Sequence, residues 1–309
     1  MSGSCGRYAP TPSGRLHLGN ARTALLSWLW ARSQRGRYVM RVEDLDPVRS
    51  RSQHERDQLD DLRWMGLDWD EGPDVGGPHG PYRQSERGEH YAAALARLST
   101  FECTCTRREL REATFAPHGR EPVYPGTCRQ SVSDPQRPRA IRWHAPAGIV
   151  EVHDAVLGPH DEDVAAQVGD FILRRSDGAW AYQLAVVVDD AAMGVTHVLR
   201  GADLWTSTAR QVALQRALGL PTPRYAHVPL VLGPDGEKLG KRHGAPDLTR
   251  LRLDGADPQR LVATLARSAG LVGPRVQRVR PASLVADFEL DRVPRDDTVL
   301  DLATLRHPG

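Results

Sequence analysis

The sequence predicts an α/β fold built on a parallel sheet. A short extended run at residues 6–9 leads through two prolines into an amphipathic helical pattern at residues 18–33, and residues 37–43 alternate as a strand does. A strand, a helix and a strand of these lengths form a βαβ crossover, in which the two strands are parallel. Such sheets bind nucleotides at the carboxyl ends of their strands, so we expect a site there.

The chain continues this alternation of helices and β-rich runs. Residues 53–65 are predicted to form a helix that Gly66 ends, and residues 86–98 form another, with Ser85 as its N-cap. The run at residues 185–188 is apolar enough to predict a buried parallel strand. The other predicted elements are strands at residues 171–174 and 195–201 and helices at residues 206–218 and 258–268.

Residues 101–170 differ in character from the rest, because they hold many prolines, short alternating runs and three of the four cysteines. We therefore predict a Rossmann-like domain in two halves, residues 1–100 and 171–245, with a small inserted subdomain at residues 101–170. A short, mainly helical region at residues 246–309 follows them.

Composition excludes several classes of protein. The 309 residues are 40% hydrophobic, which excludes a disordered chain. With 41 basic and 39 acidic residues the net charge is only +2, so any nucleic-acid surface must be a local patch. No run approaches the roughly 20 apolar residues of a membrane span, and no apolar signal region begins the chain. We therefore expect a cytoplasmic protein.

The chain between the first strand and the first helix predicts a phosphate or nucleotide pocket. Pro10 and Pro12 exclude helix and stiffen the turn, and Gly14 permits a further bend. A rigid loop followed by a helix directs backbone N–H groups and the positive end of the helix at one point.

Polar side chains are predicted at the same point. His17 and Asn20 lie three residues apart at the helix entrance, and therefore on one face. Glu43 ends the second strand of the βαβ unit, which places a carboxylate beside the pocket. The alternative for Glu43 is a cap for the following helix.

A basic loop near the other end of the chain could neutralise phosphate charge. After a Gly-Pro-Asp-Gly turn, residues 238–242 read Lys-Leu-Gly-Lys-Arg. Ammonium groups in a glycine-containing loop can fold over phosphates during group transfer. The alternative is a solvated basic turn.

Three stretches resemble class I aminoacyl-tRNA synthetases of the glutamyl branch. Residues 9–14, Ala-Pro-Thr-Pro-Ser-Gly, and 17–20, His-Leu-Gly-Asn, resemble their first ATP signature, and residues 238–242 resemble the lysine loop that closes over ATP. Residues 80–87, Gly-Pro-Tyr-Arg-Gln-Ser-Glu-Arg, are also similar to glutamyl-tRNA synthetases. Asn20 departs from the usual second histidine, and Gly240 from the usual serine.

The resemblance implies activation of an amino acid by ATP, with magnesium accompanying the ATP. His17, Lys238 and Lys241 would be catalytic: His17 would bind the phosphates, and the lysines would stabilise the transition state. The implied ATP-binding residues are Pro10, His17, Gly19, Asn20, Lys238, Leu239, Gly240, Lys241 and Arg242.

The resemblance also implies an L-glutamate pocket, which needs cations for carboxylates and a carboxylate for the ammonium group. Arg7 and Tyr182 would hold the γ-carboxylate, Glu43 the ammonium group and Arg200 a carboxylate, each at the end of a predicted strand. Thr11 keeps the hydroxyl of the family's serine. The implied glutamate-binding residues are Arg7, Tyr8, Ala9, Pro10, Thr11, Glu43, Tyr182 and Arg200.

The clustered cysteines indicate a structural zinc site in the insert. Cys103, Cys105 and Cys128 supply three thiolates, and tetrahedral Zn²⁺ needs a fourth ligand. His118 is the fourth ligand that chemistry favours. The resemblance favours Tyr124, because related proteins with a short insert carry Cys-x-Cys followed by Tyr-x-x-x-Cys.

The resemblance covers the catalytic half of glutamyl-tRNA synthetases, at residues 7–270, and does not extend to their anticodon-binding half. This pattern resembles the glutamyl-Q tRNA(Asp) synthetase family, which activates glutamate without tRNA and transfers it to the queuosine base of tRNA(Asp). It implies an insert of the acceptor-binding type and a monomer. The alternatives are a truncated glutamyl-tRNA synthetase charging an acceptor end and a non-catalytic tRNA-binding paralogue.

Overall fold

The central sheet confirms the predicted parallel α/β fold. The computed structural model describes residues 3–114, 123–233, 235–237, 239 and 246–300. Its main sheet has six strands in the order β2-β1-β8-β9-β5-β6, with every neighbouring pair parallel except β5 and β6. These strands are β1 (Cys5–Tyr8), β2 (Arg37–Met40), β5 (Ile149–Asp154), β6 (Gly158–Asp163), β8 (His197–Gly201) and β9 (Arg224–Val228).

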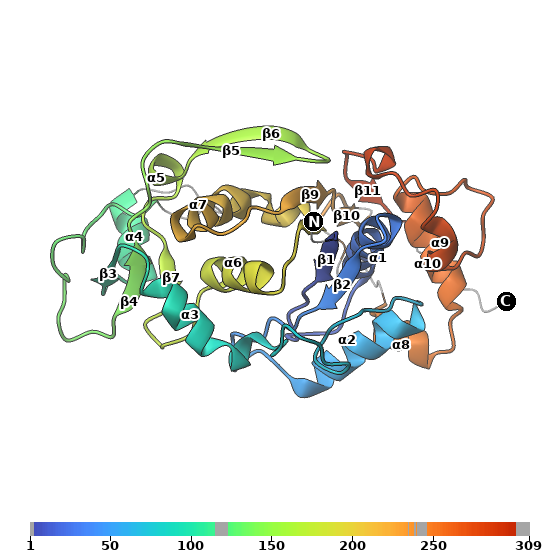
Figure 1. Ribbon diagram of the computed structural model, residues 1–309, viewed down its shortest axis with the longest axis horizontal. Helices are drawn as coiled ribbons and strands as arrows, with labels where there is room; N and C mark the ends of the chain where they lie inside the picture. Colours follow the sequence, from blue (N-terminus) through green and yellow to red (C-terminus); the bar gives the residue numbers. More distant parts are fainter. Residues whose placement is uncertain (1–2, 115–122, 234, 238, 240–245, 301–309) are drawn as a thin grey trace.

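Helices cover both faces of this sheet. In Figure 1, α1 (Leu18–Ser33) and α9 (Pro258–Ser268) lie to one side of β1 and β2, and α6 (Tyr182–Ala192) and α7 (Thr208–Leu218) lie to the other. The buried apolar side chains accordingly form two large clusters. One contains Leu25 and Leu265, and the other contains Val187 and Val212.

The β1–α1–β2 unit has the helix bounds that the sequence predicts, Leu18–Ser33. However, α1 is buried on nearly all sides rather than on one apolar face, because α9 and α10 (Pro281–Leu284) cover the side away from the sheet. Gly6 lets the helix approach the strand closely, since a Cβ at this position would lie 2.9 Å from that of Ala31.

A second, antiparallel sheet of β3 (Thr100–Cys103), β4 (Ala140–Trp143) and β7 (Ile172–Arg174) forms beside α4 (Arg107–Thr114). The division between the two sheets does not coincide with the predicted end of the insert at residue 170. The β5–β6 hairpin, before it, belongs to the main sheet, where Asp154 pairs with Tyr225 of β9. β7, after it, belongs to the small sheet.

The prediction of a strand at residues 185–188 is wrong, because these residues lie inside α6. A short apolar run is typical of a buried strand and of a buried helix alike, and α6 is buried throughout residues 184–190. The predicted helix at residues 86–98 is shorter, with a 3₁₀ turn η1 (Gln84–Glu86) and a helix α3 (Gly88–Leu95). β2 also ends early, at Met40.

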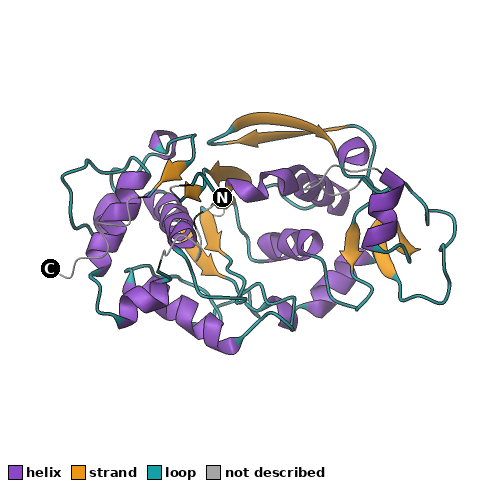
Figure 2. Ribbon diagram, turned by 180° about the vertical axis from the view of Figure 1, so that it is seen from behind, coloured by secondary structure: helices purple, strands orange, loops and turns teal. Residues whose placement is uncertain are grey.

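The C-terminal part of the described chain contains short helices joined by long loops, as Figure 2 shows. It returns to the main domain through β11 (Thr298–Val299), which pairs with β10 (Val231–Leu232). None of the helices in the described ranges has the length and apolar character needed to cross a bilayer. The remaining elements are α2 (Ser52–Trp64), α5 (Val164–Gln167), α8 (Leu248–Leu253), η2 (Ala202–Ser207) and η4 (Leu290–Arg292).

Candidate active site

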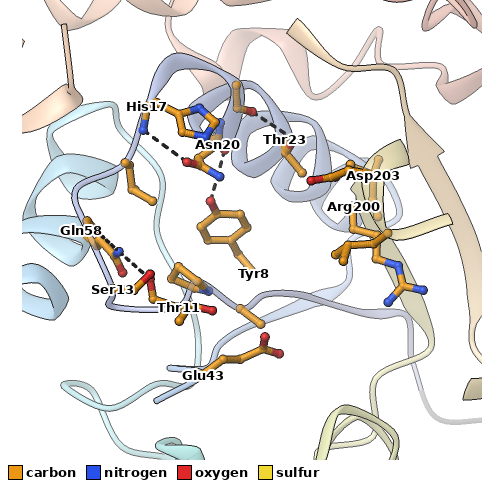
Figure 3. Close-up of a pocket in the computed structure, with 18 of the residues that line it drawn as sticks. Tyr8, Thr11, Ser13, His17, Asn20, Thr23, Glu43, Gln58, Arg200 and Asp203 are labelled. Carbon is orange, nitrogen blue, oxygen red and sulfur yellow. Dashed lines mark hydrogen bonds between the residues drawn. The ribbon is translucent and has the colours of Figure 1, made fainter. Parts of the chain in front are cut away.

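A cavity of about 600 Å³ lies at the carboxyl ends of β1, β8 and β9. Its walls include the chain after β1, the end of β8 at Arg200 and Gly201, and residues 229–231 after β9. β1 lies between β2 and β8, so the order of the strands reverses here, and α/β sheets bind ligands at such a point. Figure 3 shows side chains from these elements around the cavity.

His17 and Asn20 form a reciprocal capping box at the start of α1. The His17 Nδ1 accepts from the Asn20 backbone N–H at 3.3 Å, and the Asn20 Oδ1 accepts from the His17 backbone N–H at 3.3 Å. Because Nδ1 is an acceptor here, a neutral His17 carries its proton on Nε2. The capping box gives Asn20 a structural role at the position where the resemblance expects histidine.

Gln58 of α2 braces the loop between β1 and α1. Its Nε2 donates to the carbonyls of Thr11 at 3.0 Å and Gly14 at 2.7 Å, and it lines the cavity. Its buried Oε1 has no hydrogen-bond partner among the described residues. The carbonyl of Pro10 accepts from the Glu43 N–H at 3.0 Å, so the loop is held from two sides.

A buried ionic network joins Arg7 and Glu43. Asp190 of α6 accepts from the Arg7 Nε at 3.4 Å and from the Arg41 Nη1 at 2.7 Å, and the Arg41 Nη2 donates to Glu43 at 3.2 Å. Burial raises the pKa of Asp190, but Arg41 and Arg7 outweigh it and hold that pKa below its usual range. For Glu43 burial dominates, so its pKa is raised despite Arg41.

Asp189 carries a second set of buried contacts next to this network. It accepts from the Arg87 Nε at 2.5 Å, the Gln84 Nε2 at 2.8 Å and the Tyr91 hydroxyl at 2.8 Å. Arg87 and Asp189 neutralise each other, and both are fully buried. Asp189 also lies 3.9 Å from the Arg41 Nε, so these buried ion pairs restrict the network that holds Arg7 and Glu43.

Arg200 of β8 is held on three sides. Its Nε donates to the His227 Nε2 at 2.9 Å, its Nη2 to the Thr208 Oγ1 at 2.9 Å and its Nη1 to the Tyr182 hydroxyl at 3.2 Å. His227 in turn contacts Asp154, with 2.7 Å between Nδ1 and Oδ2. Burial raises the pKa of Tyr182, so its hydroxyl stays protonated.

The structure brings most of the predicted site residues to one cavity. Tyr182 begins α6 and does not end a strand as predicted. Leu239 lies away from the cavity lining: it is buried in the apolar core, and its N–H donates to the Val231 carbonyl at 2.8 Å. His118, Lys238, Gly240, Lys241 and Arg242 lie outside the described residues. The residues at the cavity are Arg7, Tyr8, Ala9, Pro10, Thr11, His17, Gly19, Asn20, Glu43, Tyr182 and Arg200.

Sequence reasoning missed the side chains that hold these groups in place. Asp190 carried a signal, because a carboxylate directly after an apolar run needs a buried partner. Asp154, Thr208 and His227 carried none, since they approach Arg200 only when β5, α7 and β9 assemble. Gln58 lies in a helix whose sequence is polar and gives no indication of its two carbonyl partners.

The predicted cysteine cluster forms at the end of β3, beside the small sheet. The Sγ atoms of Cys103, Cys105 and Cys128 lie within 4.8 Å of one another, and all are free thiols. The Tyr124 hydroxyl lies 3.6 Å from the Cys103 Sγ and accepts from the Cys128 N–H at 2.7 Å. The cluster could therefore hold a metal ion.

Its dimensions and chemistry fit a tetrahedral thiolate site. A Zn–S distance of about 2.3 Å places neighbouring ligand atoms about 3.8 Å apart, and the Sγ atoms of Cys105 and Cys128 are 3.6 Å apart. Hydrogen bonds from the Thr104 and Ser133 region outweigh burial and lower the pKa of Cys128 to about 6, whereas burial and the neighbouring thiols raise the pKa of Cys105 to about 11. A thiolate is the form that binds metal.

Comparison with known proteins gives a consistent family. The model of the class I tRNA synthetases (E and Q), catalytic domain, matches residues 5–279. The chain is 51% identical over 315 residues to a glutamyl-Q tRNA(Asp) synthetase of Symbiobacterium thermophilum, covering 97% of each chain. It is 49% identical to a protein of the same name from Nocardia farcinica, covering 99% of this chain and 96% of the relative.

Longer proteins named glutamate–tRNA ligases are also similar. A ligase of Acidithiobacillus ferrooxidans is 42% identical, with 97% of this chain matching 65% of the relative. Among solved structures, a glutamate tRNA ligase of Elizabethkingia meningosepticum in complex with its amino acid superimposes with a TM-score of 0.85 at 27% identity, covering 98% of this chain and 68% of that one.

Proposed function

The chain belongs to the class I tRNA synthetases for glutamate and glutamine, and within them to the glutamyl-Q tRNA(Asp) synthetase family, and from that premise we propose its reaction. It activates L-glutamate with ATP in the absence of tRNA and transfers the glutamyl group to the queuosine base of tRNA(Asp). In the first step a glutamate carboxylate oxygen attacks the α-phosphorus of ATP. Pyrophosphate leaves, and a glutamyl adenylate forms.

The observation that carries this proposal is the charge arrangement at the cavity. Arg7, Arg15 and Arg200 are the guanidinium groups of its described lining, and Glu43 and Asp203 are the carboxylates. The surplus of one positive charge complements glutamate, whose net charge at neutral pH is negative, better than the neutral glutamine.

The side chains take roles that match their positions. Arg7 and Tyr182 bind the γ-carboxylate, Glu43 the ammonium group and Arg200 a carboxylate. Burial raises the pKa of Glu43, and a bound ammonium group would favour the ionised form that the cavity disfavours. Binding of the substrate ammonium group and ionisation of Glu43 therefore favour each other.

His17 would contact ATP phosphates at the N-terminus of α1, with Pro10 in the preceding loop and Gly19 and Asn20 in the first turn of the helix. Lys238 and Lys241, outside the described residues, would neutralise charge that develops during transfer, and magnesium would accompany the ATP. Because the reaction needs little covalent help from the protein, positioning and charge neutralisation provide its catalysis.

Queuosine of tRNA(Asp) is the acceptor that the relatives support. Two proteins named for this reaction match the chain from end to end, whereas the glutamate–tRNA ligase matches over 65% of its own length. The acceptor group would be a hydroxyl of the cyclopentene ring of the modified base, on an unpaired nucleotide of the kind that proteins usually read in RNA. The enzyme would act as a monomer.

Zinc is the metal that we assign to the cysteine cluster, with Cys103, Cys105, Cys128 and Tyr124 as its ligands. Three thiolates and one oxygen close the coordination sphere, which is typical of a structural rather than a catalytic site.

Two assays test the proposal. ATP–pyrophosphate exchange without tRNA should depend on glutamate and be at least about 100-fold weaker with glutamine, because glutamine leaves charged groups unpaired. Charging should then occur on queuosine-containing tRNA(Asp), and not on queuosine-free tRNA(Asp) or on tRNA(Glu). Absence of exchange in metal-replete protein would refute the activation step, and charging of tRNA(Glu) alone would refute the acceptor.

A further inference from the structure

The contact behind Arg200 is more elaborate than an ordinary salt bridge. The Arg200 Nε donates to the ring of His227, a neutral acceptor, and the far side of that ring meets Asp154. The side chains of His227 and Asp154 are fully buried. The His227 ring also packs against Trp205 in a T-shaped arrangement, with ring centroids 4.9 Å apart at 71°. None of these three residues lines the cavity.

The Arg200 guanidinium has N–H groups left to bind a ligand. A guanidinium has five N–H groups. In Arg200 one is used by His227, one by Thr208 and one by Tyr182. Among the described residues, none accepts from the second N–H of either terminal nitrogen, and Arg200 lines the cavity. Two N–H groups on neighbouring nitrogens form the fork that binds a carboxylate in bidentate fashion.

Two separate constraints select one tautomer of His227. Arg200 can only donate, so the His227 Nε2 must accept. Asp154 accepts from the backbone N–H groups of Val156 and Leu157, both at 2.9 Å, and of His227 at 3.1 Å, as an ionised carboxylate does. The His227 Nδ1 must therefore carry the proton and donate it to Asp154.

The pKa values agree with this geometry. Burial lowers the pKa of His227 to about 4, so the ring is neutral at physiological pH. Burial raises the pKa of Asp154, but hydrogen bonds from His227 and Leu157 outweigh it, so the carboxylate is ionised.

We propose that His227 and Asp154 are positioning residues for Arg200, which fix the plane of its guanidinium so that two N–H groups receive a carboxylate of the amino acid. This inference rests on the proposed function. Asp154 selects the tautomer, His227 fixes the Nε edge of the guanidinium, and Thr208 and Tyr182 fix its two terminal nitrogens. The β5–β6 hairpin thereby contributes to amino acid binding without touching the ligand.

The variant Asp154→Asn tests the tautomer directly. Three backbone N–H groups keep Oδ1 in place, so the new amide nitrogen faces the His227 Nδ1 and donates to it. The imidazole proton then moves to Nε2, where it opposes the Arg200 Nε–H. An aspartate-to-asparagine change that leaves the geometry intact and reverses a histidine tautomer has this effect in serine proteases.

We expect kcat/KM for glutamate in the exchange assay to fall about 10- to 100-fold in Asp154→Asn, the effect of a misplaced charge-assisted contact. The KM for ATP should stay within about threefold, since Arg200 does not contact ATP in the proposed arrangement. The ¹⁵N NMR shifts of the imidazole should change from the Nδ1–H to the Nε2–H pattern. The signal is assigned by its absence from His227→Gln.

A second pair of variants decides the matter if Asp154→Asn does not fold. His227→Leu removes the acceptor and should lose glutamate activation about 10- to 100-fold, whereas the Oε1 of His227→Gln can accept from Arg200 and should retain activity within about fivefold. His153→Gln, on the exposed side of β5, is the matched control. Equal activity of the Leu and Gln variants would overturn the proposal.

The outcomes separate this inference from the proposed function. If the wild-type chain shows no glutamate-dependent exchange, the proposed function is refuted. The tautomer of His227 can still be measured in that case, because the ¹⁵N NMR experiment does not require turnover. A wild-type chain that is active, with a folded Asp154→Asn variant of unchanged tautomer or unchanged kcat/KM for glutamate, refutes the positioning role alone.

Discussion

At the scale of single residues, Arg7 combines a buried ion pair with a place in the lining of the cavity. Its Nε pairs with Asp190 at 3.4 Å, while the residue lines the cavity. Arg7→Ala should lower kcat/KM for glutamate roughly 100-fold or more, because a charge-assisted contact to the substrate is lost. The fold should persist, since Asp190 keeps Arg41 at 2.7 Å. ATP–pyrophosphate exchange and thermal unfolding measure the two effects.

Cys5 provides the control on the same strand. Its side chain lies in the apolar core, and burial raises the pKa of the thiol to about 11, so the group is neutral. Cys5→Ala should keep exchange activity within about twofold and destabilise the fold by about 1 kcal/mol through a small cavity. Equal loss of activity in both variants would show that β1 as a whole, rather than Arg7, carries the effect.

At the scale of elements, α6 carries two buried carboxylates near its C-terminus, which would destabilise the fold if they were not neutralised. Asp189 and Asp190 lie in the last two turns, where the helix dipole disfavours negative charge, and both are buried. Guanidinium groups from β1, from the end of β2 and from the start of α3 neutralise them. The ion pairs therefore fix α6 against the sheet, and with it Tyr182 at the other end of the helix.

Asp190→Asn should destabilise the protein by about 3–5 kcal/mol at pH 7, because it removes the carboxylate that the buried guanidinium groups of Arg7 and Arg41 share. The pKa of Asp190 is lowered in the folded state, so its contribution is present above the unfolded pKa of about 3.9 and is lost as the pH falls through the folded value. The difference from wild type should therefore be largest above about pH 5 and shrink below about pH 4. Denaturant unfolding at both pH values measures it.

Asp177→Asn is the matched control for this prediction. Its partner Arg175 lies at 2.6 Å, but both side chains are about half exposed. Such a pair contributes little, so the change should stay within about 0.5 kcal/mol at either pH. A similar loss in both variants, or a difference for Asp190→Asn that does not depend on pH, would contradict a buried ionic origin.

The elements also show how far the sequence could predict the site. The β1–α1–β2 unit was predictable, because its contacts are local and the start of its helix is marked by a proline-containing turn. The helix α6 was not, since four apolar residues in a row have no period that distinguishes a strand from a helix. His227 and Asp154 were out of reach for a different reason: they are 73 residues apart and meet through the pairing of β5 with β9.

At the scale of the whole molecule, the catalytic and cysteine sites lie in different sheets. Figure 1 places β3 and β4 at one end of the molecule, α9 and α10 at the other end, and β1 between them. The thiol cluster lies beside the small sheet in an apolar cluster of its own with Leu110 and Tyr124, and the cavity lies at the main sheet. Another apolar cluster, which contains Trp143 and Leu173, joins the small sheet to the main domain. Loss of the metal should therefore affect the two steps of the proposed reaction unequally.

Cys105→Ser tests this separation, because it removes one of three thiol ligands on a residue that is only partly buried. Metal analysis should find about one equivalent of zinc in the wild type and in Cys5→Ala, and little in Cys105→Ser. Glutamate-dependent exchange should stay within about threefold, since local unfolding can be confined to one cooperative unit. Transfer to tRNA should fall at least about tenfold, because the insert would no longer present a folded surface.

Chelation followed by addition of magnesium should reproduce the effect in the wild type. If exchange and transfer are lost in parallel, the two sheets unfold together. If the wild type is fully active without zinc, the assignment of zinc to the cysteine cluster is wrong.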